Sequence, residues 1–284
     1  MITLINDNWT FSEYSLDGKI NSEDKKTNLL EPEQFFDLAE KLTYTHIELP
    51  HDWMIGHTKE LYKNSVGFYK KEINISEDIS DRYIALAFEG VYMNCGVWVN
   101  NQLAGKWKYG YSNFEFDISS LVKAGKNEIL VIAVYQNCNT RWYSGAGIFR
   151  DVNLINSPAT HLVTDGTYFV AKKNDSDKNL WQIKLSTEVA ENCQGSKIQF
   201  FLNDSKTNSN FFSSPLIQLE NTNPKNNQQV QLLQFEYTVE NPKIWDIESP
   251  DFYILKTQLF DDNNNLLDET NQHCGFKTIE FTSD

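Results

Sequence analysis

Residues 88–119 read FEGVYMNCGVWVNNQLAGKWKYGYSNFEFDIS, and the middle of this stretch predicts a β-hairpin. Every second residue from Met93 to Val99 is apolar, which gives a strand with one apolar face. Asn100 and Asn101 follow, and both tolerate the positive φ angles of a tight turn. The next run is therefore expected to fold back on the first strand.

Strand patterns extend on both sides of this hairpin. Residues 84–88 are apolar at every position, so we expect a strand that is covered on both faces. Residues 129–134 are also continuously apolar, as in a central buried strand. The one convincing helix runs from about Pro32 to Leu42, because proline suits a first helical turn and an apolar stripe follows it. We expect it to cover one face of a β domain.

A second series of strands begins near Ser157 and Pro158. The alternation is clearest from Trp181 to Val189. Further strands are expected at 198–202, 230–239, 252–260 and 276–281, with loops at 203–215 and 221–229. About seven short strands in roughly 125 residues suit an immunoglobulin-like sandwich. The sequence thus predicts an all-β protein, with a jelly-roll β-sandwich in residues 1–157 and an immunoglobulin-like β-sandwich in residues 158–284.

The charge and composition limit the partners of the chain. Its 284 residues carry 39 acidic and 25 basic side chains, a formal net charge of −14. Nucleic acids and anionic membrane surfaces require clustered Lys and Arg, so neither is an expected partner. Aromatic residues make up 13% of the chain, which suits strands and is compatible with a carbohydrate ligand.

The beginning of the chain and its cysteines indicate the compartment. The start, MITLINDNWTF, has no basic residue and no long apolar run, so we expect no signal peptide and a cytoplasmic location. The four cysteines are far apart and form no CxxC pair, and His46, His51 and His57 are not at the spacing of metal ligands. We therefore expect free thiols, no metal and no cofactor.

Five segments together resemble glycoside hydrolase family 2, in the order expected for that family. They are LPHDW at 49–53, VGFYKK at 66–71, the 88–119 stretch, RWYSGAGIFRDV at 141–152, and the segment NPKIWDIESPDFYILKTQLFDDNNNLLDETNQHCGFKTIEF at 241–281. The segment at 141–152 is similar to the RWYSGSGIYRDV of β-galactosidases. Because the five segments cover nearly the whole chain, the sequence is identified as a β-galactosidase-like member of the family.

This resemblance implies a sugar-binding jelly-roll domain, then an immunoglobulin-like domain, and then a catalytic (α/β)₈ barrel. The barrel would begin just after the GFKTIEF segment, and the sequence stops at Asp284. Both catalytic glutamates of the family lie on barrel strands, so we expect no catalytic residue here and a downstream barrel as the main partner. Asn127-Glu128 is similar to the Asn-Glu pair of the family, but it leads into a buried strand and is interpreted as structural.

The resemblance also suggests which residues touch the sugar. In the family, jelly-roll loops reach over the mouth of the barrel and help to shape the galactosyl subsite. Asp52, Arg141 and Trp142 occupy such loops and are the expected substrate-binding residues. Carboxylate and guanidinium groups suit hydroxyl recognition, and an indole gives an apolar wall. Some β-galactosidases have an acidic residue near the position of Arg141.

Three readings of the function remain open at this stage. In the first, the chain is the non-catalytic N-terminal portion of a β-galactosidase that hydrolyses terminal β-galactosides with retention. In the second it is a freestanding carbohydrate-binding module, and in the third a scaffold between subunits. The parent enzyme could also be a β-glucuronidase or a β-mannosidase, since these share the front architecture, and homo-oligomer formation is left open.

Overall fold

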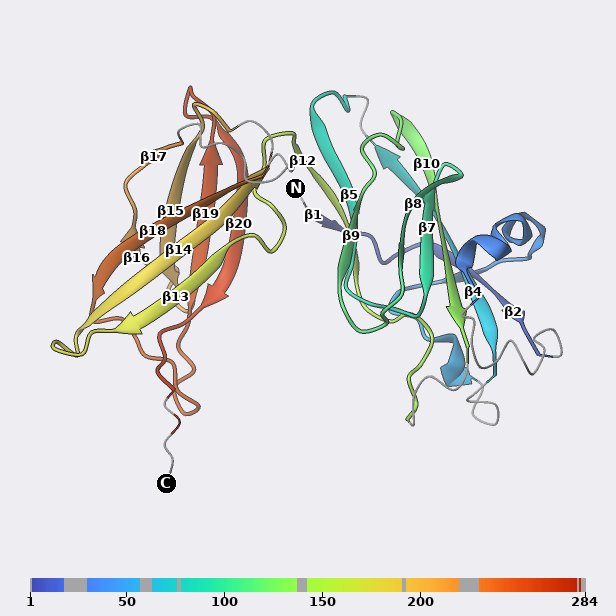
Figure 1. Ribbon diagram of the computed structural model, residues 1–284, viewed down its shortest axis with the longest axis horizontal. Coiled ribbons are helices and arrows are strands. Elements are labelled where there is room, and N and C mark those ends of the chain that lie inside the picture. The colour runs from blue at the N-terminus through green and yellow to red at the C-terminus, as the bar shows by residue number, and fades with distance from the viewer. Residues whose placement is uncertain are drawn as a thin grey trace. The chain divides into compact units, whose positions relative to one another are not determined.

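The computed structural model divides the chain into two compact units, residues 1–156 and 157–284 (Figure 1). It describes residues 2–17, 30–56, 63–75, 78–136, 142–190, 193–219, 230–279 and 281. Strands dominate both units, so the predicted all-β fold is confirmed. None of the helices in these ranges has the length and apolar character needed to cross a membrane.

The first unit is a sandwich of two β-sheets. One sheet has four strands in the order β1-β12-β5-β9, and the other has six in the order β3-β2-β4-β10-β7-β8, while β11 and β6 form a separate pair. The elements are β1 (Ile2–Leu4), β2 (Trp9–Ser15), η1 (Pro32–Lys41), β3 (Thr45–Ile47), η2 (Trp53–Gly56), β4 (Ser65–Ile75), β5 (Arg82–Phe88), β6 (Val91–Tyr92), β7 (Cys95–Val99), β8 (Gln102–Trp107), β9 (Phe114–Asp117), β10 (Gly125–Tyr135), β11 (Gly147–Ile148) and β12 (Val152–Pro158).

Strand β10 lies at the centre of the six-stranded sheet, between β4 and β7. Ile129, Val131 and Ala133 face the core between the two sheets. Leu130 and Ile132 face the opposite way, into a second apolar cluster that includes residues of η1. The continuous apolar run at 129–134 therefore reflects burial on both faces, as the sequence predicts.

The predicted helix at Pro32 to Leu42 is present as the 3₁₀ helix η1. Its apolar residues are spaced by three, as in Phe36, Ala39 and Leu42, which suits the three residues per turn of a 3₁₀ helix. These side chains pack on the outer cluster of the six-stranded sheet. The helix thus covers one face of the β domain, as expected.

The hairpin at the centre of the 88–119 stretch joins β7 to β8, and its register pairs Val99 with Gln102. Asn100 and Asn101 have φ angles of 50° and 65°, so both occupy the left-handed region. This conformation matches a two-residue hairpin turn. The strand itself begins at Cys95, two residues later than the alternating pattern indicates.

The second unit is also a sandwich of two sheets, which agrees with the predicted immunoglobulin-like architecture. One sheet has the order β13-β14-β18 and the other β16-β15-β19-β20, with β17 paired to β15. Their core contains the fully buried Phe200, Leu255 and Phe276. The strands are β13 (Tyr168–Lys173), β14 (Leu180–Ala190), β15 (Lys197–Asp204), β16 (Asn210–Ser213), β17 (Ile217–Gln218), β18 (Val230–Glu240), β19 (Tyr253–Phe260) and β20 (Leu266–Cys274).

Two predictions for the second unit are wrong. The last strand is not at 276–281: Phe276 forms only an isolated bridge with Ile244, and the strand β20 lies earlier, at 266–274. The segment 203–215 is not entirely loop, since it contains the end of β15 and all of β16. The predicted loop at 221–229 lies outside the described residues.

Candidate functional site

The candidate site of the first unit lies where residues 49–56 meet residues 142–148. Backbone hydrogen bonds join the two segments, from the His51 amide to the Ile148 carbonyl at 2.8 Å and from the Trp53 amide to the Ala146 carbonyl at 3.0 Å. The second segment is fixed in turn by β11, where Gly147 pairs with Tyr92 of β6. Two loops far apart in the sequence are therefore joined into one rim.

Asp52 fastens this rim through three hydrogen bonds. Its Oδ1 accepts from the backbone amides of Met54, at 3.0 Å, and Ala146, at 2.9 Å. Its Oδ2 accepts from the hydroxyl of Tyr143 at 2.5 Å. Burial, with the nearby Asp52 carboxylate, raises the pKa of the Tyr143 hydroxyl, so this group stays protonated and acts as the donor.

Glycine is required at two positions of the second segment. Gly145 has a φ of +69°, and a Cβ there would lie 2.7 Å from Oδ2 of Asp52. Gly147 has a φ of +131°, and a Cβ would lie 2.4 Å from both the His51 carbonyl and the Tyr69 hydroxyl. The SGAG sequence thus allows the close approach that places Asp52 against the 142–148 segment.

Buried aromatic side chains hold the loop that carries Asp52 in place. The Trp53 ring is buried, its Nε1 donates to Ser65 Oγ at 2.9 Å, and it packs against Gly67, where a Cβ would lie 2.4 Å from the ring. His51 Nδ1 lies 2.9 Å from the hydroxyl of the fully buried Tyr69. Burial lowers the pKa of His51, although the Asp52 carboxylate partly opposes this, so the imidazole is neutral at pH 7.

The outer part of the rim carries exposed aromatic groups. Trp142 is 63% exposed and Tyr143 is 44% exposed. The buried Tyr92, whose backbone pairs with Gly147, packs its ring against Tyr111 with ring centroids 5.0 Å apart, and Tyr111 contacts the exposed Tyr109 at 6.0 Å. Flat rings next to a carboxylate are a combination that suits a sugar, which offers both C–H faces and hydroxyl groups.

The hydrogen bonds of Asp52 in the described residues do not use every acceptor position of its carboxylate. An ionised carboxylate has about four acceptor positions, two on each oxygen. Both positions of Oδ1 are occupied by backbone amides, whereas Oδ2 accepts only from Tyr143 in the described structure. Within the described residues, one acceptor position on Oδ2 therefore takes no hydrogen bond.

Of the three residues expected from the sequence, two can be placed. Asp52 lies at the junction of the two segments. Trp142 is exposed and directly precedes Tyr143 in the chain, and Tyr143 donates a hydrogen bond to Asp52. Arg141 lies outside the described residues. Sequence reasoning missed Tyr143, which holds Asp52 from 91 positions away. The two glycines at 145 and 147 are the signal that could have drawn attention to this contact.

Asn127-Glu128 is structural, as predicted. The buried Asn127 side chain accepts from the Lys123 amide and donates to the carbonyls of Lys123 and Gly125, which closes the turn before β10. Glu128 lies on the surface, 3.8 Å from the Lys70 ammonium group. Neither side chain is placed at the Asp52 rim.

Comparison with known proteins gives consistent matches. The family model described as the sugar binding domain of glycosyl hydrolases family 2 matches residues 3–158, and a second model described as glycosyl hydrolases family 2 matches residues 162–277. A protein from Formosa agariphila named as a β-glucuronidase is 30% identical over 83% of this chain and 28% of its own length. A β-galactosidase from Bacteroides ovatus is 27% identical over the same shares of the two chains.

Solved structures agree with these matches. A family 2 glycosyl hydrolase from Bacteroides cellulosilyticus superposes with a TM-score of 0.77 and 25% identity, covering 99% of this chain and 37% of that one. A β-glycosidase from Bacteroides vulgatus gives a TM-score of 0.75 and 25% identity, with 99% and 34% covered. The chain thus spans well under half the length of these relatives. With both family models matched in order over residues 3–277, the chain belongs to glycosyl hydrolase family 2.

Proposed function

We propose that the chain is the non-catalytic N-terminal portion of a β-galactosidase of this family, which hydrolyses terminal β-galactosides with retention. Retaining glycosidases need two carboxyl groups about 5–5.5 Å apart, one as acid/base and one as nucleophile. The family resemblance assigns both to a barrel downstream of the two β-sandwich units. The β-galactosidase from Bacteroides ovatus supports this assignment, since this chain covers 28% of its length.

In this proposal the Asp52 rim contributes to the sugar subsite of the parent enzyme. The observation that carries it is the second acceptor position on Asp52 Oδ2, which takes no hydrogen bond within the described residues, in a loop that is joined to the segment carrying the exposed Trp142. Asp52 accepts a hydrogen bond from a sugar hydroxyl, Trp142 gives the apolar wall, and the guanidinium of Arg141 offers further donors. Backbone hydrogen bonds join the two segments of the rim, which reduces the ordering that binding needs.

A β-glucuronidase is the second candidate, because the relative from Formosa agariphila carries that name at 30% identity. A glucuronide has a carboxylate on its sugar ring, which would meet the like charge of Asp52 if bound close to it. This repulsion favours the neutral galactoside. Hydrolysis rates of matched chromogenic β-galactoside and β-glucuronide substrates by the parent enzyme decide between the two.

The first test is the reading frame beyond Asp284. The proposal requires an in-frame barrel with two glutamates in catalytic positions, and it requires that residues 1–284 alone hydrolyse no chromogenic β-galactoside. A stop codon directly after Asp284 would contradict it and favour a freestanding carbohydrate-binding module. Hydrolysis by the 284-residue chain at enzymatic rates would also contradict it.

The second test is the substitution Asp52→Asn in the parent enzyme. Loss of a hydrogen bond to a charged acceptor costs about 1.5–3 kcal/mol, so kcat/KM for a β-galactoside is expected to fall roughly tenfold to a hundredfold. Tyr143→Phe is the matched control, since it removes the Tyr143–Asp52 bond but keeps the carboxylate. An equal loss in both variants would mean that Asp52 only maintains the loop, and would contradict its role in binding.

A further inference from the structure

Aromatic side chains gather at one place on the surface of the first unit. They come from the loop between β8 and β9 and from the segment between β11 and β12. Tyr109 is 62% exposed, and its ring contacts that of the partly exposed Tyr111. Tyr111 in turn contacts the partly exposed Phe149, with ring centroids 6.1 Å apart. The exposed Arg150 places its guanidinium over the Phe149 ring, 5.2 Å from the centroid. We call these four residues the Tyr109 patch.

The Tyr109 patch adjoins the Asp52 rim. Phe149 and Arg150 directly follow the rim segment 142–148 in the chain. The Tyr92 hydroxyl makes hydrogen bonds with Ser144 of the rim and with Tyr111 of the patch. Ser144 follows Tyr143, which donates to the Asp52 carboxylate. The patch and the rim are therefore linked both along the chain and through the Tyr92 side chain.

Two glycines allow the backbone to lie close to these rings. A Cβ at Gly110 would lie 2.2 Å from the Tyr92 ring, and a Cβ at Gly90 would lie 2.8 Å from the Phe149 ring. A residue with a side chain could take neither place without a shift of its neighbours. The loop that carries Tyr109 thus packs directly on Tyr92, which reduces the ordering that a ligand would have to impose.

The side chains of the patch suit a carbohydrate. Aromatic rings attract the C–H faces of a sugar, and the Tyr109 ring is exposed to receive one. The Arg150 guanidinium carries five N–H donors, and the Tyr109 hydroxyl can both donate and accept. Rings with hydrogen-bonding groups at both ends of the row fit a ligand that has apolar faces and hydroxyl edges, as a sugar has.

We propose that the Tyr109 patch binds the sugar residues that follow the terminal galactose of an oligosaccharide substrate. One sugar stacks on Tyr109, and its hydroxyls accept hydrogen bonds from Arg150. This assignment rests on the proposed function, in which the Asp52 rim contributes to the subsite of the terminal galactose. The patch then gives the parent enzyme a preference for galacto-oligosaccharides over galactosides with a small leaving group.

Saturation-transfer difference NMR on the 284-residue chain with β-1,4-galactotriose tests the proposal. All measurements use the Asp52→Asn background, which removes the carboxylate of the rim. We expect a Kd of roughly 3 mM. Tyr109→Ala should weaken binding about threefold to tenfold, because the stacked ring is lost, and Tyr109→Phe should restore it to within about twofold. Arg150→Ala should weaken binding about fivefold.

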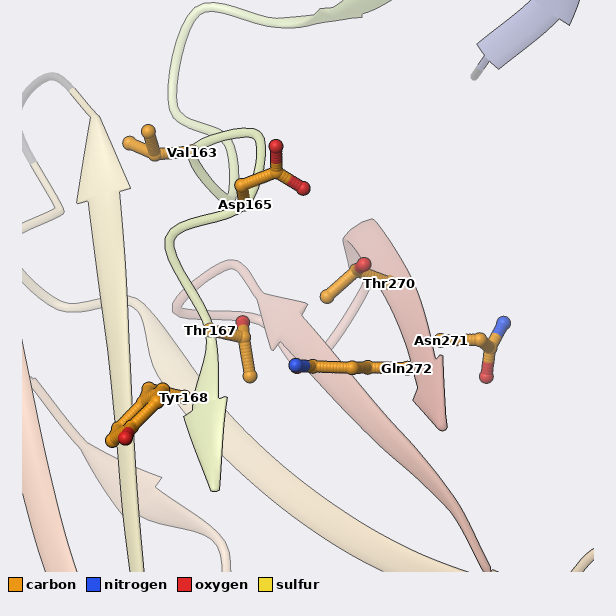
Figure 2. A pocket seen from close by; sticks show the side chains of 7 residues that line it. All are labelled: Val163, Asp165, Thr167, Tyr168, Thr270, Asn271 and Gln272. Atoms are coloured by element: carbon orange, nitrogen blue, oxygen red, sulfur yellow. The ribbon is translucent and has the colours of Figure 1, made fainter. Parts of the chain in front are cut away.

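Tyr168→Ala is the matched control, because Tyr168 is a tyrosine of the second unit with a similar exposure of 64%. It lines a pocket of about 290 Å³ there, but its side chain points away from Thr270 and Gln272 on the opposite wall (Figure 2). This variant should keep the Kd within about twofold. A loss equal to that of Tyr109→Ala would mean that any exposed tyrosine binds the sugar, and would overturn the proposal.

Two further outcomes would overturn the patch as a sugar site. One is the lack of any signal from galactotriose at about 20 mM in the Asp52→Asn background. The other is unchanged binding in both Tyr109→Ala and Arg150→Ala. Failure of the proposed function looks different: a stop codon directly after Asp284 would contradict the parent enzyme, while galactotriose would still bind to the 284-residue chain and still depend on Tyr109.

Discussion

At the residue scale, His51 makes the stability of the first unit depend on pH. Its imidazole is half-buried and its pKa is lowered by burial, with the Asp52 carboxylate opposing. The unfolded chain therefore binds this proton more readily than the folded chain. The stabilising contribution is complete above the unfolded pKa of about 6.5 and is lost as the pH falls from there through the folded pKa.

We therefore expect the melting temperature of the first unit to fall between about pH 7.5 and pH 5. The variant His51→Gln lacks the imidazole that protonates in this range. Its melting temperature, measured by scanning calorimetry, should therefore fall less than that of the parent chain. His46→Gln, on an exposed side chain of the same unit, keeps the His51 contribution and serves as the control. A pH dependence in His51→Gln equal to that of the parent chain would contradict the assignment.

At the residue scale, only part of the candidate site could be predicted from the sequence. Asp52 could be selected because it lies in a recognisable loop motif and carries a carboxylate. Its partner Tyr143 could not, since their bond joins positions 91 residues apart and depends on the conformations of Gly145 and Gly147. Local sequence indicates which groups are present, whereas long-range backbone pairing decides which of them meet.

At the scale of elements, strands with a strong apolar pattern were predictable, whereas the edge strand β20 was not. β10 and β14 have regular apolar patterns and lie inside their sheets. β20 reads LLDETNQHC, with little alternation, and it exists because it pairs with β19 from Leu266 to Cys274. The sequence instead predicts a strand that begins at the apolar Phe276. Phe276 packs in the core, but its backbone forms only an isolated bridge.

The β7–β8 hairpin gives a prediction at this scale. Asn101 has a φ of 65°, a conformation that costs a residue with an ordinary side chain roughly 1–2 kcal/mol. Asn101→Ala should lower the free energy of unfolding by about 1 kcal/mol, whereas Asn101→Gly should be neutral or slightly stabilising, as measured by urea denaturation. Gln102→Ala, on the exposed next residue, is the control. Equal stability of the Ala and Gly variants would contradict the turn assignment.

At the scale of the whole molecule, each unit has a core of its own. The apolar clusters of the first unit draw on residues 5–152, and that of the second on residues 162–276, with no residue in common. A protein with separate cores need not unfold in one step. Whether the two units unfold as one can therefore be tested by creating a cavity in each core in turn.

Leu86→Ala and Leu255→Ala form a matched pair, since both leucines are fully buried, one in each unit. Each substitution should cost about 2–5 kcal/mol, which corresponds to a shift of roughly 5–15 °C in the melting temperature of its own unit. Scanning calorimetry should show two transitions, and each variant should lower a different one, because the cavity weakens only the core that contains it. A single transition lowered equally by both variants would mean that the units are energetically coupled despite their separate cores.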